Sequence, residues 1–145
     1  MRFELEIEVA RPPEDVYAYL ADPGNLAGWQ EEVAEVRGAT GEPLSAGATF
    51  TEVRTFLGKR VESEIEVTSS EPGREYSLRS RTGPVRFSVR HLLEPAGTGT
   101  RLRLVGEADP GKLFGVAGPL LRRAAERRTK ADFRRLKAVL ETRGE

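Results

Sequence analysis

The sequence contains no cysteine and only one histidine, His91. The first absence excludes disulfides, zinc–thiolate sites, iron–sulfur clusters and a cysteine nucleophile, and the second excludes metal sites built from several histidines. A phosphate-binding glycine loop and a recognisable nucleophile motif are missing as well. We therefore expect neither a metal nor a cofactor.

An excess of charge of either sign is also missing. The chain has 23 Lys and Arg and 23 Asp and Glu, so its formal net charge is zero. This balance argues against a nucleic-acid partner, because nucleic-acid binders carry a strong basic excess. No long apolar run is present, and the charged, alternating N-terminus resembles neither a signal peptide nor a transmembrane helix. We expect a cytoplasmic monomer or homodimer without stable membrane insertion.

The first third of the chain shows one strand followed by short helices. Apolar and acidic residues alternate strictly over residues 3–9, which predicts a half-buried strand. Two prolines end it, and Pro13, followed by two acidic residues, predicts a helix over about 13–21. A proline- and glycine-containing turn then leads to a short helical turn that ends at Trp29.

The middle of the chain alternates short apolar segments with turns rich in glycine and proline. Because the turns are closely spaced, they favour hairpins and one antiparallel meander of seven strands, counting the first. The six further strands are expected near residues 33–38, 46–57, 60–69, 74–81, 85–94 and 100–107.

A helical period begins after residue 110 and predicts a long helix from about 119 to 142. Its apolar stripe is expected to hold Leu113, Phe114, Ala117, Leu121, Ala124, Ala125, Leu136, Val139 and Leu140. Its basic face holds Arg123, Arg127, Lys130, Arg134 and Lys137. Residues 1–36 hold two basic and nine acidic groups, whereas residues 110–145 hold ten and four. Two explanations stay open: a solvated helix face near an acidic partner surface, or a site for an anionic ligand or membrane surface.

Strand parity predicts which side chains face the inside of the sheet. The strand over 60–69 has its apolar residues at odd positions, and an even-length hairpin through Gly58 then turns even positions of the preceding strand inward. These inward residues are Phe50, Glu52, Arg54 and Phe56. Glu52 and Arg54 are an acid and a base on one face. They lie either solvated at an open rim or buried as an anchor that needs a partner or a ligand.

Three other polar or aromatic positions are expected to face the same interior. His91 shares the parity of Phe87 and is either a core histidine with one hydrogen bond or a pocket donor or general base. Tyr76, on the neighbouring strand, is expected to pack with its hydroxyl bonded to one partner. Trp29 either fills the core or lies at the mouth of a cavity.

Two charged residues interrupt the apolar stripe of the long helix. Arg128 and Asp132 lie four positions apart, where a pure core helix carries alanine or leucine. Either they form an ion pair with each other, or they contact a ligand or the Glu52–Arg54 pair.

The set of residues at the turns and at the ends of the expected strands and helices resembles that of a known superfamily. It consists of Arg-Pro-Pro-Glu-Asp-Val-Tyr at 11–17, then Leu20, Asp22-Pro23, Trp29, Gly47, Glu71-Pro72-Gly73, Leu93-Glu94-Pro95 and Gly99-Thr100-Arg101-Leu102. Together with the element order, it resembles the START-like helix-grip (SRPBCC) superfamily, most of all its polyketide cyclase/dehydrase-like and lipid-transport-like members. The resemblance covers nearly the whole chain and implies one α+β domain over 1–145, in which a curved seven-stranded antiparallel sheet wraps around the C-terminal helix.

The resemblance also implies a cavity between sheet and helix that takes hydrophobic or amphipathic molecules. The first hypothesis is binding of a lipid, quinone or polyketide-like molecule without catalysis. The alternatives are a polyketide cyclase or dehydratase using acid–base residues of the cavity, and a protein-interaction module using the basic helix. The candidate cavity residues are Trp29, Phe50, Glu52, Arg54, Phe56, Tyr76, Phe87, His91, Phe114, Leu121, Arg128 and Asp132.

Overall fold

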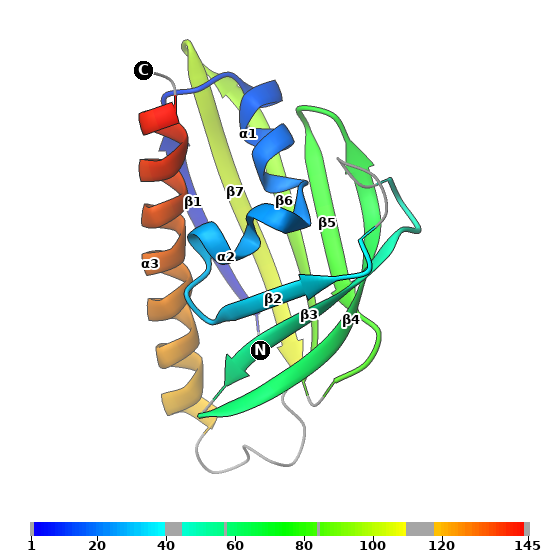
Figure 1. Cartoon of the computed structure of the whole chain (residues 1–145). Helices are drawn as coiled ribbons and strands as arrows, with labels where there is room; N and C mark the ends of the chain where they lie inside the picture. The colour runs from blue at the N-terminus through cyan, green and yellow to red at the C-terminus, as the bar shows by residue number, and fades with distance from the viewer. Residues whose placement is uncertain (1, 40–44, 57, 84, 110–117, 144–145) are drawn as a thin grey trace.

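A computed structural model describes residues 2–39, 45–56, 58–83, 85–109 and 118–143 (Figure 1). It contains the strands and helices that the sequence predicts, in the predicted order. The elements are β1 (Arg2–Val9), α1 (Pro13–Leu20), the 3-10 helix η1 (Pro23–Asn25), α2 (Leu26–Trp29), β2 (Val33–Arg37), β3 (Thr49–Phe56), β4 (Lys59–Glu71), β5 (Glu75–Ser80), β6 (Arg86–Ala96), β7 (Gly99–Asp109) and α3 (Gly118–Arg143).

The strands form one seven-stranded antiparallel sheet in the order β1-β7-β6-β5-β4-β3-β2. Strands β2 to β7 follow one another as a meander, and β1 closes onto β7 at the far edge. The sheet curves, and its inner face is covered by α3 on one side and by α1 and α2 beside it (Figure 1). The fold is therefore α+β, as predicted, with a long C-terminal helix packed on the sheet.

The hairpin between β3 and β4 has the even length that the parity argument requires. Phe56 pairs with Lys59, so two residues separate the strands, and Gly58 has a φ of +79°. This positive φ suits glycine because other residues adopt it only with strain. The pairing puts Phe50 opposite Ile65 and Arg54 opposite Val61. The inner-face assignment of β3 is confirmed for Phe50, Glu52 and Arg54, and the side chain of Phe56 lies outside the described residues.

The inner face of α3 differs in part from the predicted apolar stripe. Leu136 and Leu140 are buried as expected, but Ala124 is exposed. Phe133, which the stripe did not include, is the largest fully buried side chain. It lies three positions before Leu136 on the same face, so the helical period contained the signal. Leu113, Phe114 and Ala117 lie outside the described residues, as does the side chain of Leu121.

The outer face of the sheet is covered by ion pairs between neighbouring strands. Val53 faces this side, as strand parity predicts, yet it is 0% exposed and lies outside the main hydrophobic cluster. Its cross-strand neighbours are Glu62 on β4 and Glu35 on β2. These two carboxylates are ion-paired with Arg37 and Arg60 respectively. The aliphatic stems of long paired side chains thus remove an outward valine from water.

Candidate functional site

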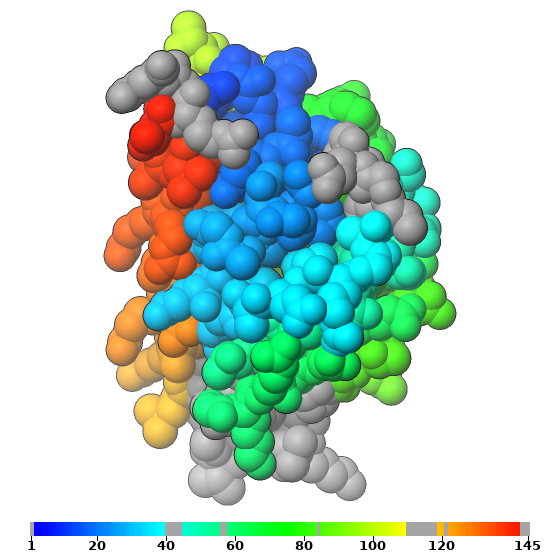
Figure 2. Space-filling view, in the orientation of Figure 1, coloured from blue at the N-terminus to red at the C-terminus, as the bar shows by residue number. Residues whose placement is uncertain are grey.

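One half of the interior is a tightly packed aromatic core. The ring of His91 stacks on Tyr76 at 6.2 Å and on Phe133 at 6.3 Å, and Trp29 tilts against Phe133 at 5.9 Å. These four side chains are at most 4% exposed. The segment from α1 to β2 closes the molecule over this half, as the space-filling view shows (Figure 2). The packing leaves these rings no contact with solvent.

His91 is held as a neutral core residue. Its Nδ1 atom lies 2.9 Å from the carbonyl oxygen of Tyr76, which can only accept, so Nδ1 carries the proton and donates it. Burial lowers the pKa of His91 to about 4, although the bond to the Tyr76 carbonyl opposes that shift. Of the two roles that the sequence left open, the structure places His91 in the core with one hydrogen bond.

Two tyrosines lie beside this histidine. The Tyr17 hydroxyl is 2.5 Å from the Ser70 hydroxyl, and the Tyr17 and Tyr76 rings meet edge to face at 6.4 Å. Burial, together with the nearby Tyr17 and Asp22, raises the pKa of Tyr76 well above its usual range. Tyr76 therefore stays protonated and acts as a packing residue.

Glu52 and Arg54 form a partly buried ion pair on the inner face of β3. Glu52 is 6% exposed, and Arg54 Nε donates to Glu52 Oε1 over 2.8 Å. Arg54 Nη2 also donates to Gln30 Oε1 over 2.7 Å. Burial lowers the pKa of Arg54 most strongly, but Glu52, Glu32 and Asp132 together outweigh it and raise that pKa. Glu52 is therefore buried against its cation, while the Arg54 side chain stays 28% exposed.

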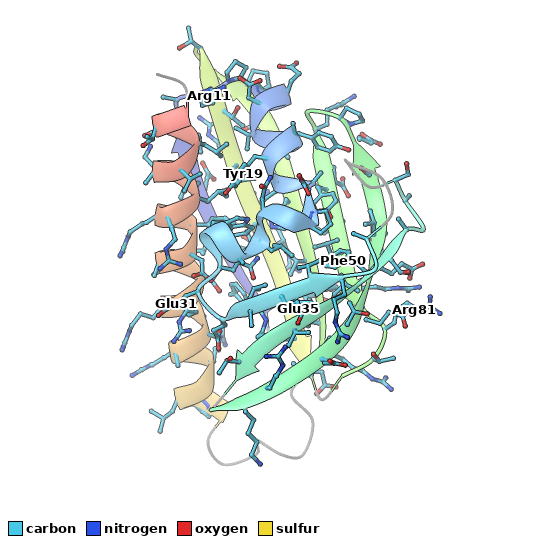
Figure 3. All side chains as sticks on the ribbon, in the orientation of Figure 1. Arg11, Tyr19, Glu31, Glu35, Phe50 and Arg81 are labelled. Carbon is cyan, nitrogen blue, oxygen red and sulfur yellow. The ribbon has the colours of Figure 1, made fainter. Side chains whose placement is uncertain are left out.

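Of the two alternatives for Arg128 and Asp132, an ion pair with each other is not formed. Arg128 lies within 3.5 Å of Glu32 and 3.8 Å of Glu31, beside α3 (Figure 3). Asp132 Oδ1 instead accepts from the Glu31 backbone N–H at 3.2 Å and pairs with Arg135 at 3.4 Å. The acidic turn between α2 and β2 thus contacts both side chains, in place of a pair between them. Sequence periodicity could not foresee this turn, because it comes from a segment about a hundred positions away.

Charged contacts link α3, the turn that follows α2, and β3. Glu32 lies within 3.8 Å of Arg54 and so joins α3 to β3, and Arg135 donates to the Trp29 carbonyl oxygen over 3.1 Å. Burial raises the pKa of Asp132, while the Glu31 N–H and the neighbouring arginines lower it. Every charged candidate from the sequence thus has a partner within the protein. Gln30, Glu31, Glu32 and Arg135 were missed, since only the tertiary fold brings them here.

The other half of the inner face is less tightly packed. The apolar residues there are only partly buried: Phe3 and Leu5 on β1, Leu78 on β5, and Phe87 and Val89 on β6. A hollow of about 900 Å³ lies at this end of the sheet. Its inner side is lined by Ser80, Phe87 and Ala108. Its rim carries Arg2, Arg79, Arg81 and Arg86 together with Glu107 and Asp109.

The candidate cavity residues divide between these two halves. Phe87 lines the hollow, whereas Trp29, Phe50, Tyr76 and His91 lie in the packed core. The side chain of Phe56, Phe114 and the side chain of Leu121 lie outside the described residues. Within the packed half, the Trp29 Nε1 atom is buried with no hydrogen-bond partner. Ala108 was missed because the predicted strand ended one residue earlier, although its parity matches that of Leu102 and Leu104.

The described residues contain no cluster of three or more metal-ligating side chains. Among the same residues, no helix combines the length and apolar character that crossing a bilayer requires.

These features define a helix-grip protein, in which a curved antiparallel sheet holds a long C-terminal helix. Residues 1–141 match the family model described as "Polyketide cyclase / dehydrase and lipid transport". The chain belongs to this family. A search of curated proteins found no match.

Solved structures support the same fold. A conserved protein from Geobacillus kaustophilus superposes with a TM-score of 0.79 at 19% identity, covering 98% of this chain and 96% of that one. TTHA0849 from Thermus thermophilus gives 0.72 at 24% identity, covering 99% and 96%. Ara h 8.0201 gives 0.73 at 12% identity, covering 98% of both chains. At these identities, the likeness concerns the fold alone.

Proposed function

We propose that this protein binds an apolar or amphipathic small molecule in the hollow at the end of the sheet where β1, β5, β6 and β7 meet, and that it does so without catalysis. The observation that carries the proposal is the uneven packing of the inner face. One half is sealed. The other has partly buried Leu78, Val89 and Phe87, of which Phe87 lines a hollow of about 900 Å³. That volume lies within the range of small-molecule sites. The hollow is open and its lining is largely polar, with Phe87 and Ala108 as its apolar wall.

The polar groups around the hollow suit an amphipathic occupant. Phe87 and Ala108 offer an apolar wall, and the rim carries four arginines against two acidic residues. Arg86 has no ionic partner among the described residues, whereas Arg79 and Arg81 are paired with Glu66 and Glu64. A ligand whose apolar part lies against this wall and whose polar or anionic end lies at the rim is complementary to both.

The absence of catalysis is inferred from how the acid–base candidates are engaged. A general base needs a free lone pair within reach of a substrate and a pKa near the working pH. His91 is buried and its pKa is lowered to about 4, and Glu52 is bound to Arg54. Neither residue lines the hollow. A cyclase or dehydratase would therefore need other residues than these two.

Thermal denaturation with a compound library tests the proposal. Fatty acids, quinones, flavonoids and aromatic polyketides would be screened, and a ligand at 100 times its Kd should add about 2.7 kcal/mol to the free energy of unfolding. The substitution Ala108→Phe, which would fill the hollow, should abolish this ligand-induced stabilisation and the rise in melting temperature that reports it. The same substitution at exposed Ala18 on α1 is the matched control and should retain it. Equal shifts in both variants would place the ligand elsewhere, and no shift with any class would contradict the binding role.

A further inference from the structure

The outward face of α3 carries a stripe of cations that the protein itself does not neutralise. Arg123, Arg127, Lys130 and Arg134 are exposed, and none has an ionic partner among the described residues. Their spacing of four, three and four residues puts them on one side of the helix. Nitrogen-tipped side chains project from α3 away from the sheet (Figure 3).

This stripe contrasts with the rest of the surface. On the outer face of the sheet, arginines alternate with glutamates and are paired across strands, as with Arg101–Glu94 at 2.7 Å and Arg103–Glu4 at 3.1 Å. The acidic residues nearest the stripe on α3 are also engaged. Glu126 binds Arg122, and Glu141 binds Lys137 and the Ala10 N–H. The positive charge of the stripe is thus available to an external partner.

One apolar side chain continues the stripe at the start of the helix. Leu120 is 72% exposed, and among the described residues it is the large hydrophobic side chain that is exposed to water. It lies three positions before Arg123 and so on the same side of α3. From Leu120 to Arg134 the stripe extends about 21 Å, given a rise of about 1.5 Å per residue.

We propose that this stripe, Leu120 with Arg123, Arg127, Lys130 and Arg134, docks the protein peripherally on an anionic lipid bilayer. Lys130 borders a hollow between β1 and α3, but Arg123, Arg127 and Arg134 do not line it. A row of long, flexible cations of this kind matches a flat and diffuse anionic surface. Leu120 then enters the headgroup region, while the apolar side of α3 stays packed on the sheet, so the contact is electrostatic and reversible.

Other anionic partners fit these observations less well. Protein interfaces are centred on aromatic residues and arginine and are depleted in lysine, and the stripe has no aromatic residue. Nucleic-acid binders carry a strong basic excess, whereas this chain has a formal net charge of zero. The proposal does not depend on ligand binding in the hollow, although α3 begins at the same end of the molecule (Figure 1).

Vesicle co-sedimentation of the full chain tests the docking surface. The protein should sediment with phosphatidylcholine vesicles containing about 30% phosphatidylserine at about 50 mM salt, and not with phosphatidylcholine alone. Each surface cation contributes about fivefold to partitioning. The triple variant Arg123→Gln, Arg127→Gln, Arg134→Gln should therefore bind about 100-fold more weakly. Leu120→Ser should weaken binding further at salt concentrations that screen charge.

A pair of double variants provides the matched control. Lys59 and Arg74 are also exposed and without an ionic partner among the described residues, and neither lines the hollow. Arg123→Gln, Arg127→Gln should weaken vesicle binding about 25-fold. Lys59→Gln, Arg74→Gln makes the same change in net charge and should weaken it no more than a few-fold. Both double variants should melt like the parent, since no pair is broken. Equal losses in the two double variants, no binding to anionic vesicles, or tighter stripe-dependent binding to single-stranded DNA or to an acidic protein would each overturn the proposal.

Discussion

The Nδ1 atom of His91 lies 2.9 Å from the carbonyl oxygen of Tyr76, directly opposite it across β5 and β6. The contact requires a proton on Nδ1 and leaves the ring neutral between Tyr76 and Phe133. A second proton would place an uncompensated charge in an aromatic core.

This geometry predicts that acid destabilises the protein through His91. Its pKa is about 4 in the folded protein and about 6.5 when unfolded, so the unfolded chain binds the proton more tightly. The stabilisation is fully present above pH 6.5 and is lost as the pH falls toward 4. Over that window it amounts to a few kcal/mol.

Chemical denaturation of the parent and His91→Phe at pH 7.5 and pH 5 measures this effect. The parent should lose more stability than the variant between the two pH values, because phenylalanine keeps the ring stack but cannot be protonated. Parallel profiles for both proteins would show that His91 is not the buried neutral group described above.

The Glu52–Arg54 pair should behave as a coupled unit. Arg54→Leu leaves the buried Glu52 carboxylate without its cation and should cost about 3–5 kcal/mol of stability. Adding Glu52→Leu should recover part of that loss, because no uncompensated charge remains. The exposed pair Arg60–Glu35 is the control, with a coupling of at most about 1 kcal/mol. A similar coupling energy in the double-mutant cycles of the two pairs would contradict burial of the inner pair.

Val53 should respond to truncation as a core residue although it faces outward. Val53→Ala is expected to cost about 2 kcal/mol, since the side chain is 0% exposed and its methyl groups are removed from water. Thr55→Ala, two positions along the same strand and exposed, should change stability by under about 0.5 kcal/mol. Equal effects in urea denaturation would show that the flanking ion pairs do not shield Val53.

Gly99 should tolerate no side chain. A Cβ at this position would lie 2.3 Å from the Val9 carbonyl oxygen, so β1 and β7 would have to separate where they meet. Gly99→Ala should cost about 3 kcal/mol. Gly97→Ala, in the preceding turn at φ +63°, would put its Cβ in open space with no atom within 4 Å, and should cost about 1 kcal/mol. A melting temperature for Gly99→Ala at or above that of Gly97→Ala would be the contrary result.

Local patterns in the chain were enough to determine the architecture and much of the inner face. Alternation over residues 3–9 and the proline at 13 act on neighbouring residues only, so β1 and α1 could be predicted without knowledge of the rest. The same holds for the even hairpin at Gly58, which placed Glu52 and Arg54 together on the inner side of β3. Parity also placed His91 and Tyr76 on that face, where the structure confirms them.

Tertiary structure alone decided what those side chains do. Arg128 and Asp132 were expected either to pair with each other or to contact a ligand or the Glu52–Arg54 pair. The turn at 30–32 packs on α3 and supplies partners that no local pattern reveals. The neutral state of His91 and the burial of Glu52 follow from desolvation, which depends on every element packed around them. Sequence determined which face each residue occupies, because strand and helix periods are local; the fold decided which residues meet, because burial and charge pairing act between distant segments.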